Sequence, residues 1–140
     1  MKPRMVRAVA STSALAVGLV PQLPWVTTGA RSRNSYEVFR SAQALGVDEL
    51  TPLRVAWFLV PVLALGVVGW IAVGRLRLAA GFLAVAALLV AGVAVVVVAA
   101  GLAAPGAWVA LVVGVAALVA SALLVPRGSS DPRAVSIREP

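Results

Sequence analysis

The sequence predicts an all-α integral membrane protein, a bundle of four transmembrane helices with one short amphipathic helix in the first external loop. The first observation behind this prediction is a set of four long apolar stretches, none of which carries a charge in its central turns. The second is composition, because hydrophobic residues make up 61% of the chain and charged residues only 12%, with a mean hydropathy of +1.01. A water-soluble domain of this size could not bury so much apolar surface. Residues 1–140 are therefore expected to form a single membrane domain.

The four apolar stretches have the length of membrane spans. Crossing a hydrocarbon core of about 30 Å takes about 20 helical residues, and a helix pairs its backbone N–H and C=O groups within the segment. The expected spans cover residues 6–26, 53–74, 76–101 and 107–125. Small residues recur every four positions in three of these spans, which favours close packing of the helices within the bundle, with homodimerisation as the alternative.

The first span has a second interpretation. Basic residues followed by an apolar run are typical of a cleaved signal peptide. We favour a retained helix, because the run from 6 to 26 exceeds the usual length of about 7–15 residues. Pro21 and Pro24 each lack a backbone donor, so the last turn of this span is expected to kink or unwind.

Basic residues divide unequally between the two sides of the four-span arrangement. Lys and Arg near helix ends favour the cytoplasmic side. One side receives eight of the twelve, Lys2, Arg4, Arg7, Arg75, Arg77, Arg127, Arg133 and Arg138. The other side receives Arg31, Arg33, Arg40 and Arg54. Both termini are therefore expected in the cytoplasm and the loop 27–52 outside, and the inverted orientation is the alternative.

Two further features concern the ends of the spans. The four tryptophans, Trp25, Trp57, Trp70 and Trp108, all lie near span ends, where indole rings usually anchor helices at the headgroup level. Residues 127–140 mix Gly, Ser, Pro and charge with little apolar content. Such a segment cannot bury enough surface to order itself, and a disordered tail is expected.

The loop 27–52 is the segment with varied chemistry. It opens with a polar, turn-like stretch, after which Asn34 or Ser35 can cap a helix, and Glu37 completes a capping box if Asn34 is the cap. Gly46 is a natural helix stop. The expected helix, 35–45, carries one apolar stripe of Val38, Phe39, Ala42 and Leu45. Glu37, Arg40 and Ser41 fall opposite, so the stripe is expected to dock on the membrane or on the mouth of the bundle.

The charged residues of this loop favour structural roles. Arg33–Glu37 and Glu37–Arg40 have ordinary ion-pair spacings, and acids such as Asp48 are favoured ahead of a helix. An anion or lipid-headgroup site is the alternative. The candidate partner or headgroup contacts are Arg31, Arg33, Tyr36, Phe39 and Arg40.

Several function classes are excluded or disfavoured. The net charge of +7 arises from arginines at span ends and in one loop, not from the interleaved basic face of a nucleic-acid-binding protein. Cysteine and histidine are absent, which removes the commonest metal ligands and the commonest general base. Nucleotide-binding and nucleophile motifs are also absent. No catalytic residues, metal or cofactor are expected.

Residues 23–29, Leu-Pro-Trp-Val-Thr-Thr-Gly, are followed by Arg-Ser-Arg-Asn-Ser-Tyr-Glu at 31–37. This run, up to about residue 61, resembles a pattern in small four-span membrane proteins of actinobacteria. The resemblance implies an architecture and an envelope location, and it implies no reaction.

These observations lead to two hypotheses about function. The first is a non-enzymatic accessory or scaffolding subunit in the cytoplasmic membrane of a bacterium, whose partners are the lipid bilayer and another membrane protein. The alternative is a protein that binds or transports a lipid or small solute. Intramembrane polar residues around a cavity would favour transport, whereas a closed bundle with an apolar outer groove would favour the accessory role.

Overall fold

A computed structural model of the chain describes residues 3–28, 31–44 and 51–125. The predicted tail, 127–140, lies outside these described residues. The elements, in chain order, are α1 (Pro3–Leu19), the 3-10 turn η1 (Val20–Gln22), β1 (Pro24–Thr28), β2 (Arg31–Asn34), α2 (Ser35–Ala44), α3 (Thr51–Ala72), α4 (Leu76–Ala99) and α5 (Pro105–Leu124). The mostly helical fold that the sequence predicts is confirmed.

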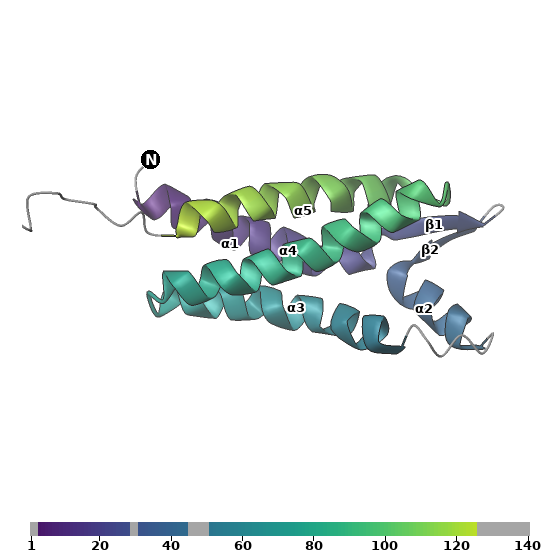
Figure 1. Cartoon of the computed structure of the whole chain (residues 1–140), viewed down its shortest axis with the longest axis horizontal. Coiled ribbons are helices and arrows are strands. Elements are labelled where there is room, and N and C mark those ends of the chain that lie inside the picture. The colour runs from purple at the N-terminus through teal and green to yellow at the C-terminus, as the bar shows by residue number, and fades with distance from the viewer. Residues whose placement is uncertain (1–2, 29–30, 45–50, 126–140) are drawn as a thin grey trace, which may run out of the picture.

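Four of the helices form an elongated antiparallel bundle (Figure 1). Around the bundle α1 lies beside α3, α3 beside α4, α4 beside α5, and α5 beside α1 again. The short helix α2 and the hairpin of β1 and β2 lie together at one end of the bundle (Figure 1). The opposite end holds the start of α1, the turn between α3 and α4, and the end of α5.

Three of the helices have the length and composition of membrane spans. They are α3 with 22 residues, α4 with 24 and α5 with 20, and all are strongly apolar. They lie where the sequence predicted its second, third and fourth spans, with ends that differ by about two residues. An integral membrane protein with three candidate spans therefore replaces the expected four-span protein.

The prediction of a span over 6–26 is wrong. Helix α1 has 17 residues, which at about 1.5 Å per residue gives about 25 Å, short of the hydrocarbon thickness. Pro21 has no N–H to donate to the preceding turn, so the helix ends at Leu19 and tightens into η1. Pro24 then begins the strand β1. Of the two expected outcomes, a kink or an unwound last turn, the structure shows the second, and the chain passes from helix through η1 to strand.

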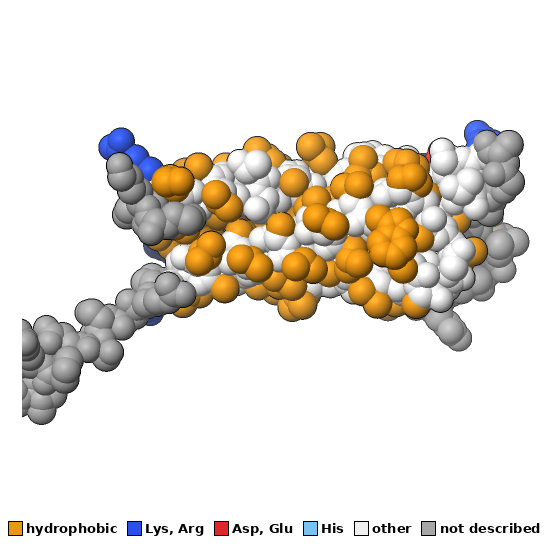
Figure 2. All heavy atoms as spheres, turned by 90° about the horizontal axis from the view of Figure 1, so that it is seen from above, with side chains coloured by type: hydrophobic (Ala, Val, Ile, Leu, Met, Phe, Trp, Pro, Cys, Tyr) orange, Lys and Arg blue, Asp and Glu red, His pale blue; other side chains and the backbone are white. Residues whose placement is uncertain are grey.

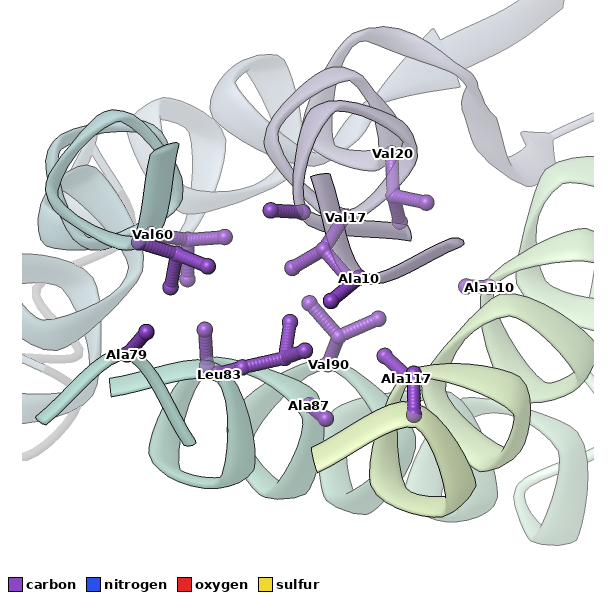
Figure 3. Close-up of a cluster of buried hydrophobic side chains, with 14 of the residues drawn as sticks. Ala10, Val17, Val20, Val60, Ala79, Leu83, Ala87, Val90, Ala110 and Ala117 are labelled. Carbon is purple, nitrogen blue, oxygen red and sulfur yellow. The ribbon is translucent and has the colours of Figure 1, made fainter. Parts of the chain in front are cut away.

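The centre of the bundle is filled by small and branched apolar side chains. Figure 3 shows side chains from the four bundle helices meeting there, among them Val17, Val60, Leu83 and Val90. These four side chains are fully buried. Alanines of the four-residue repeats, such as Ala10, are buried here as well. Small residues let helix backbones approach closely, which is the main source of packing energy between helices in lipid.

The outer surface of the bundle is apolar. Large hydrophobic side chains such as Leu65, Leu88 and Val112 are 60–69% exposed. Figure 2 shows hydrophobic side chains over the middle of the visible face and Lys or Arg side chains toward the two ends. Such a surface would aggregate in water, and it fits contact with the hydrocarbon core of a bilayer.

The contact between α4 and α5 depends on a glycine. A Cβ atom added at Gly114 would lie 2.9 Å from the Cβ of Ala91 and 3.2 Å from the backbone oxygen of Ala87. Gly92 is a matched control, because it is also helical and a Cβ atom there would meet nothing within 4 Å.

We predict that Gly114→Ala lowers the free energy of unfolding by about 1–3 kcal/mol, the usual cost of overpacking. Gly92→Ala should be neutral or raise it by up to about 1 kcal/mol, since alanine favours the helix. Unfolding of the detergent-solubilised protein, followed by circular dichroism, measures both. Equal effects of the two substitutions would contradict the close approach of α4 and α5.

Candidate functional site

The start of α2 is held by a capping box. The side-chain Oδ1 of Asn34 accepts a hydrogen bond from the backbone N–H of Glu37 at 2.9 Å. In return, the backbone N–H of Asn34 donates to Oε2 of Glu37 at 3.2 Å. Asn34 is therefore the cap, and Ser35 is free for another contact. The observed helix, Ser35–Ala44, agrees with the predicted 35–45 as far as the described residues extend.

Buried hydrogen bonds join α2 to the end of α1. The Ser35 hydroxyl donates to the backbone oxygen of Pro21 at 2.6 Å and accepts from Nε1 of Trp57 at 2.8 Å. Nε1 of Trp25 donates to the backbone oxygen of Val20 at 2.9 Å. These bonds connect η1, β1, α2 and α3 at one point, and the sequence analysis missed them.

Aromatic rings pack around these hydrogen bonds. Trp25 and Trp57 meet edge to face, with ring centroids 5.0 Å apart and planes at 87°. Phe39 of α2 lies 6.2 Å from Trp57, and Tyr36 lies 4.8 Å from Phe58 of α3, both measured between centroids. The docking of α2 on the bundle through Phe39 therefore matches the prediction, and Tyr36 is a second anchor.

Two of the tryptophans do not have the predicted location. Trp25 and Trp57 were expected to face the headgroups, but they are 1% and 0% exposed. Their indole N–H groups bond inside the protein, which allows the whole ring to be buried. Trp108, at 54% exposed, fits the predicted role, and Trp70 packs on Phe82 and under the guanidinium of Arg75.

The apolar stripe of α2 is observed in part. Val38 and Phe39 are half-buried and Glu37 and Arg40 are exposed, as the helical pattern predicts, while Ser41 is half-buried. Ala42 and Leu45 lie outside the side chains that the structure describes. Tyr36 is half-buried, and this partial burial raises the pKa of its phenol above the ordinary value.

The opposite side of α2 forms a basic hollow with β2. This hollow has a volume of about 190 Å³ and is lined by Arg31, Arg33, Glu37, Arg40 and Ser41. Nη1 of Arg33 donates to Oγ of Ser41 at 2.9 Å. In the described part of the chain, the expected ion pairs of Glu37 with Arg33 and Arg40 are not formed. The guanidinium of Arg33 bonds to a hydroxyl instead.

The candidate contacts therefore divide into two groups. Arg31, Arg33 and Arg40 share the basic hollow. Tyr36 and Phe39 contact α3. The described residues contain no group of three or more potential metal-binding side chains.

A hairpin that the sequence analysis did not expect positions the hollow. Strands β1 and β2 pair antiparallel, with Thr28 opposite Arg31 and Val26 opposite Arg33. The backbone N–H of Ala104 also donates to the oxygen of Trp25 at 3.0 Å, which fixes β1 to the start of α5. The run of Trp, Val, Thr and Thr after Pro24 has high strand propensity, and it is the local signal that could have revealed β1.

The single tyrosine of the chain permits a direct test of how α2 docks. Because burial raises the pKa of Tyr36, its phenol should ionise at a higher pH in the folded protein than after unfolding, where the value is about 10. The stabilisation that this shift represents is present below the unfolded pKa and is lost as the pH rises through the folded one. Tyrosinate absorbance against pH measures the shift.

Two phenylalanine substitutions complete this test. Phe58→Ala should lower the pKa of Tyr36 toward its unfolded value, because it removes the ring that covers the phenol. Phe82→Ala should leave the pKa unchanged, because Phe82 packs on Trp70 instead. An identical titration of folded wild type and unfolded chain would show that Tyr36 does not pack on α3.

Comparisons of the chain with protein-family models, with curated proteins and with solved structures find no match. The resemblance of residues 23–61 to small actinobacterial membrane proteins therefore stays a prediction.

Proposed function

We propose that this protein is a non-enzymatic accessory or scaffolding subunit of the bacterial cytoplasmic membrane, which binds another membrane protein through its outer surface. One observation carries the proposal. An apolar groove of about 370 Å³ lies on the outside of the bundle between α1 and α5. The lining residues are Ala8, Val9, Thr12, Ser13 and Ala16 of α1 with Val113 and Ala116 of α5.

The interior of the bundle favours this role over transport. The buried polar residues in the described part of the chain are Ser35 and Ser121. Ser35 lies at the end of the bundle, and the Ser121 hydroxyl donates to the backbone oxygen of Leu118 in its own helix at 2.7 Å. A solute path requires polar groups that converge within the membrane, whereas this interior is packed with alanine, valine and leucine.

The groove suits a membrane helix of a different protein. Its alanines allow a second backbone to approach closely, and the hydroxyls of Thr12 and Ser13 can bond to a polar group on that helix. In a symmetric dimer the same patch would face itself, and two concave grooves would leave a void. A convex helix ridge from a partner fills the groove.

Charge suggests an orientation in the membrane. Arg4 and Arg7 begin α1 and Arg75 lies in the turn between α3 and α4, all at the end of the bundle opposite α2 (Figure 1). Eight basic residues were assigned to this side of the membrane from the sequence, and most of the others among them precede α1 or follow α5 in the sequence. Because Lys and Arg favour the cytoplasmic side, we propose that this end faces the cytoplasm and that α2 faces outward. In this orientation α1 passes through the membrane within the bundle, beside α3 and α5, although it is too short to be a candidate span by itself.

Filling the groove should release the partner. Ala116 is exposed in the groove, and we expect Ala116→Leu to reduce the amount of partner recovered in mild detergent by about tenfold, the effect of about 1.4 kcal/mol. Ala122→Leu is the matched control, because Ala122 is exposed on α5 outside the groove. Quantitative mass spectrometry of tagged wild type and both variants measures the recovery.

The outcomes of this experiment separate the alternatives. If a protein co-purifies with wild type and with the Ala122→Leu variant but not with the Ala116→Leu variant, this result supports the accessory role. Loss of a second copy of this chain would mean self-association, and loss of a lipid would mean lipid binding. Identical recovery from both variants would contradict a role for the groove.

Thiol labelling tests the orientation, since the chain contains no cysteine. Ser32→Cys lies in the exposed part of β2, and Val73→Cys lies in the exposed turn between α3 and α4. A membrane-impermeant reagent added to spheroplasts should label position 32 at once, and position 73 only after the membrane is opened. The reverse pattern would establish the inverted orientation.

A further inference from the structure

We propose that the basic hollow between β2 and α2 binds a phosphate-bearing anion at the membrane surface, with Arg31, Arg33 and Arg40 as its ligands. The inference is independent of the groove between α1 and α5, because the two surfaces share no residue. The proposed anion site and the proposed accessory role are therefore independent, and either can be correct if the other is wrong.

The charge balance of the hollow favours an anion. Three guanidinium groups line it with one carboxylate, that of Glu37. One oxygen of this carboxylate accepts the bond from the backbone N–H of Asn34. Neither Arg31 nor Arg40 has an ion-pair partner in the described part of the chain. Guanidinium forks match phosphate oxygens in charge and in geometry, often through two parallel bonds.

The hollow is built on ordered elements. Arg33 is held by its bond to Ser41, and the Ser41 hydroxyl donates to the backbone oxygen of Glu37 at 2.9 Å. Arg31 lies on β2, which pairs with β1. The capping box and the Ser35 bond fix the start of α2. Two walls of the site are therefore held in place before a ligand arrives, which lowers the entropy cost of binding.

The position of the hollow suits a lipid headgroup. It lies at the end of the bundle where α3, a candidate span, begins at Thr51. On the other side of α2, Tyr36 and Phe39 pack on aromatic residues of α3. Tyrosine side chains are enriched at the level of the headgroups, where phospholipid phosphates lie, and the half-buried Tyr36 fits that level, whereas Trp57 is buried inside the protein. A free phosphate ion carries the same chemistry, so the test must separate these two sources.

The test uses Arg31→Gln with Arg40→Gln, since both side chains are exposed and neither side chain forms a hydrogen bond or ion pair in the described part of the chain. The matched control is Arg4→Gln with Arg7→Gln, which removes the same charge from exposed positions at the opposite end of the bundle. Glu37→Gln should have the opposite effect on anion binding, because it removes the negative charge from the hollow. Circular dichroism verifies that each variant is folded.

Native mass spectrometry of the full chain in mixed micelles measures how much phosphatidylglycerol it retains relative to phosphatidylcholine. We expect wild type to favour phosphatidylglycerol, and each arginine removed from the hollow to reduce this preference about fivefold. The control pair should change it less than about twofold, and Glu37→Gln should increase it. The preference should weaken at high salt, as expected for an exposed site.

A parallel titration with inorganic phosphate identifies the source of the ligand. Loss of lipid preference from the Arg31/Arg40 variant alone assigns the site to a headgroup. Loss of phosphate binding from that variant, with lipid retention unchanged, assigns it to a soluble phosphate. If the Arg31/Arg40 variant and the Arg4/Arg7 control behave alike in both measurements, the proposal is wrong.

Discussion

The backbone oxygen of Pro21 lies just beyond the end of α1, and it needs a hydrogen-bond donor that the local backbone does not supply. A helix end always leaves carbonyls without partners, and Pro24 removes a further N–H from the following turn. Near a bilayer, water is a poor substitute, and an unpaired buried carbonyl costs about 1–3 kcal/mol. The hydroxyl of Ser35 supplies the donor for the Pro21 oxygen, and the indole of Trp25 adds a second bond to the Val20 oxygen, which also accepts from the backbone N–H of Leu23. These hydrogen bonds connect the strand β1 and the short helix α2 to the end of the bundle.

The same bonds determine which way α2 faces. Ser35 is the first residue of α2, and its hydroxyl is held between the oxygen of Pro21 and the indole of Trp57. With that position fixed, the helical repeat turns Phe39 toward α3 and Arg40 toward β2. The aromatic contact and the basic hollow are thus two sides of one docked helix, and loss of the Ser35 contact would disturb both.

Much of this fold follows from local sequence, and the rest depends on contacts between distant residues. Long apolar runs are sufficient to locate α3, α4 and α5, and the Asn34–Glu37 pair is sufficient to start α2. The end of α1 was mistaken for part of a span because the apolar run continues past Pro21. Apolar content alone does not reveal that the Pro21 oxygen bonds to Ser35, 14 positions away. The arginines of the hollow were identified as candidates, but their expected ion pairs were wrong, because the partner chosen by Arg33 depends on how β2 meets α2.

The packing of the bundle explains why the two proposed binding surfaces lie on the outside. At Gly114 the helices α4 and α5 come so close that even a Cβ atom would clash with Ala91. Side chains as small as Ala87 and as compact as Val90 fill the remaining interior. Within the described residues, a bundle packed in this way has no interior space for a ligand, so the proposed ligands bind on its surface. The two binding surfaces differ in chemistry. The groove between α1 and α5 offers small apolar residues to another helix, whereas the hollow beside α2 offers positive charge to a phosphate.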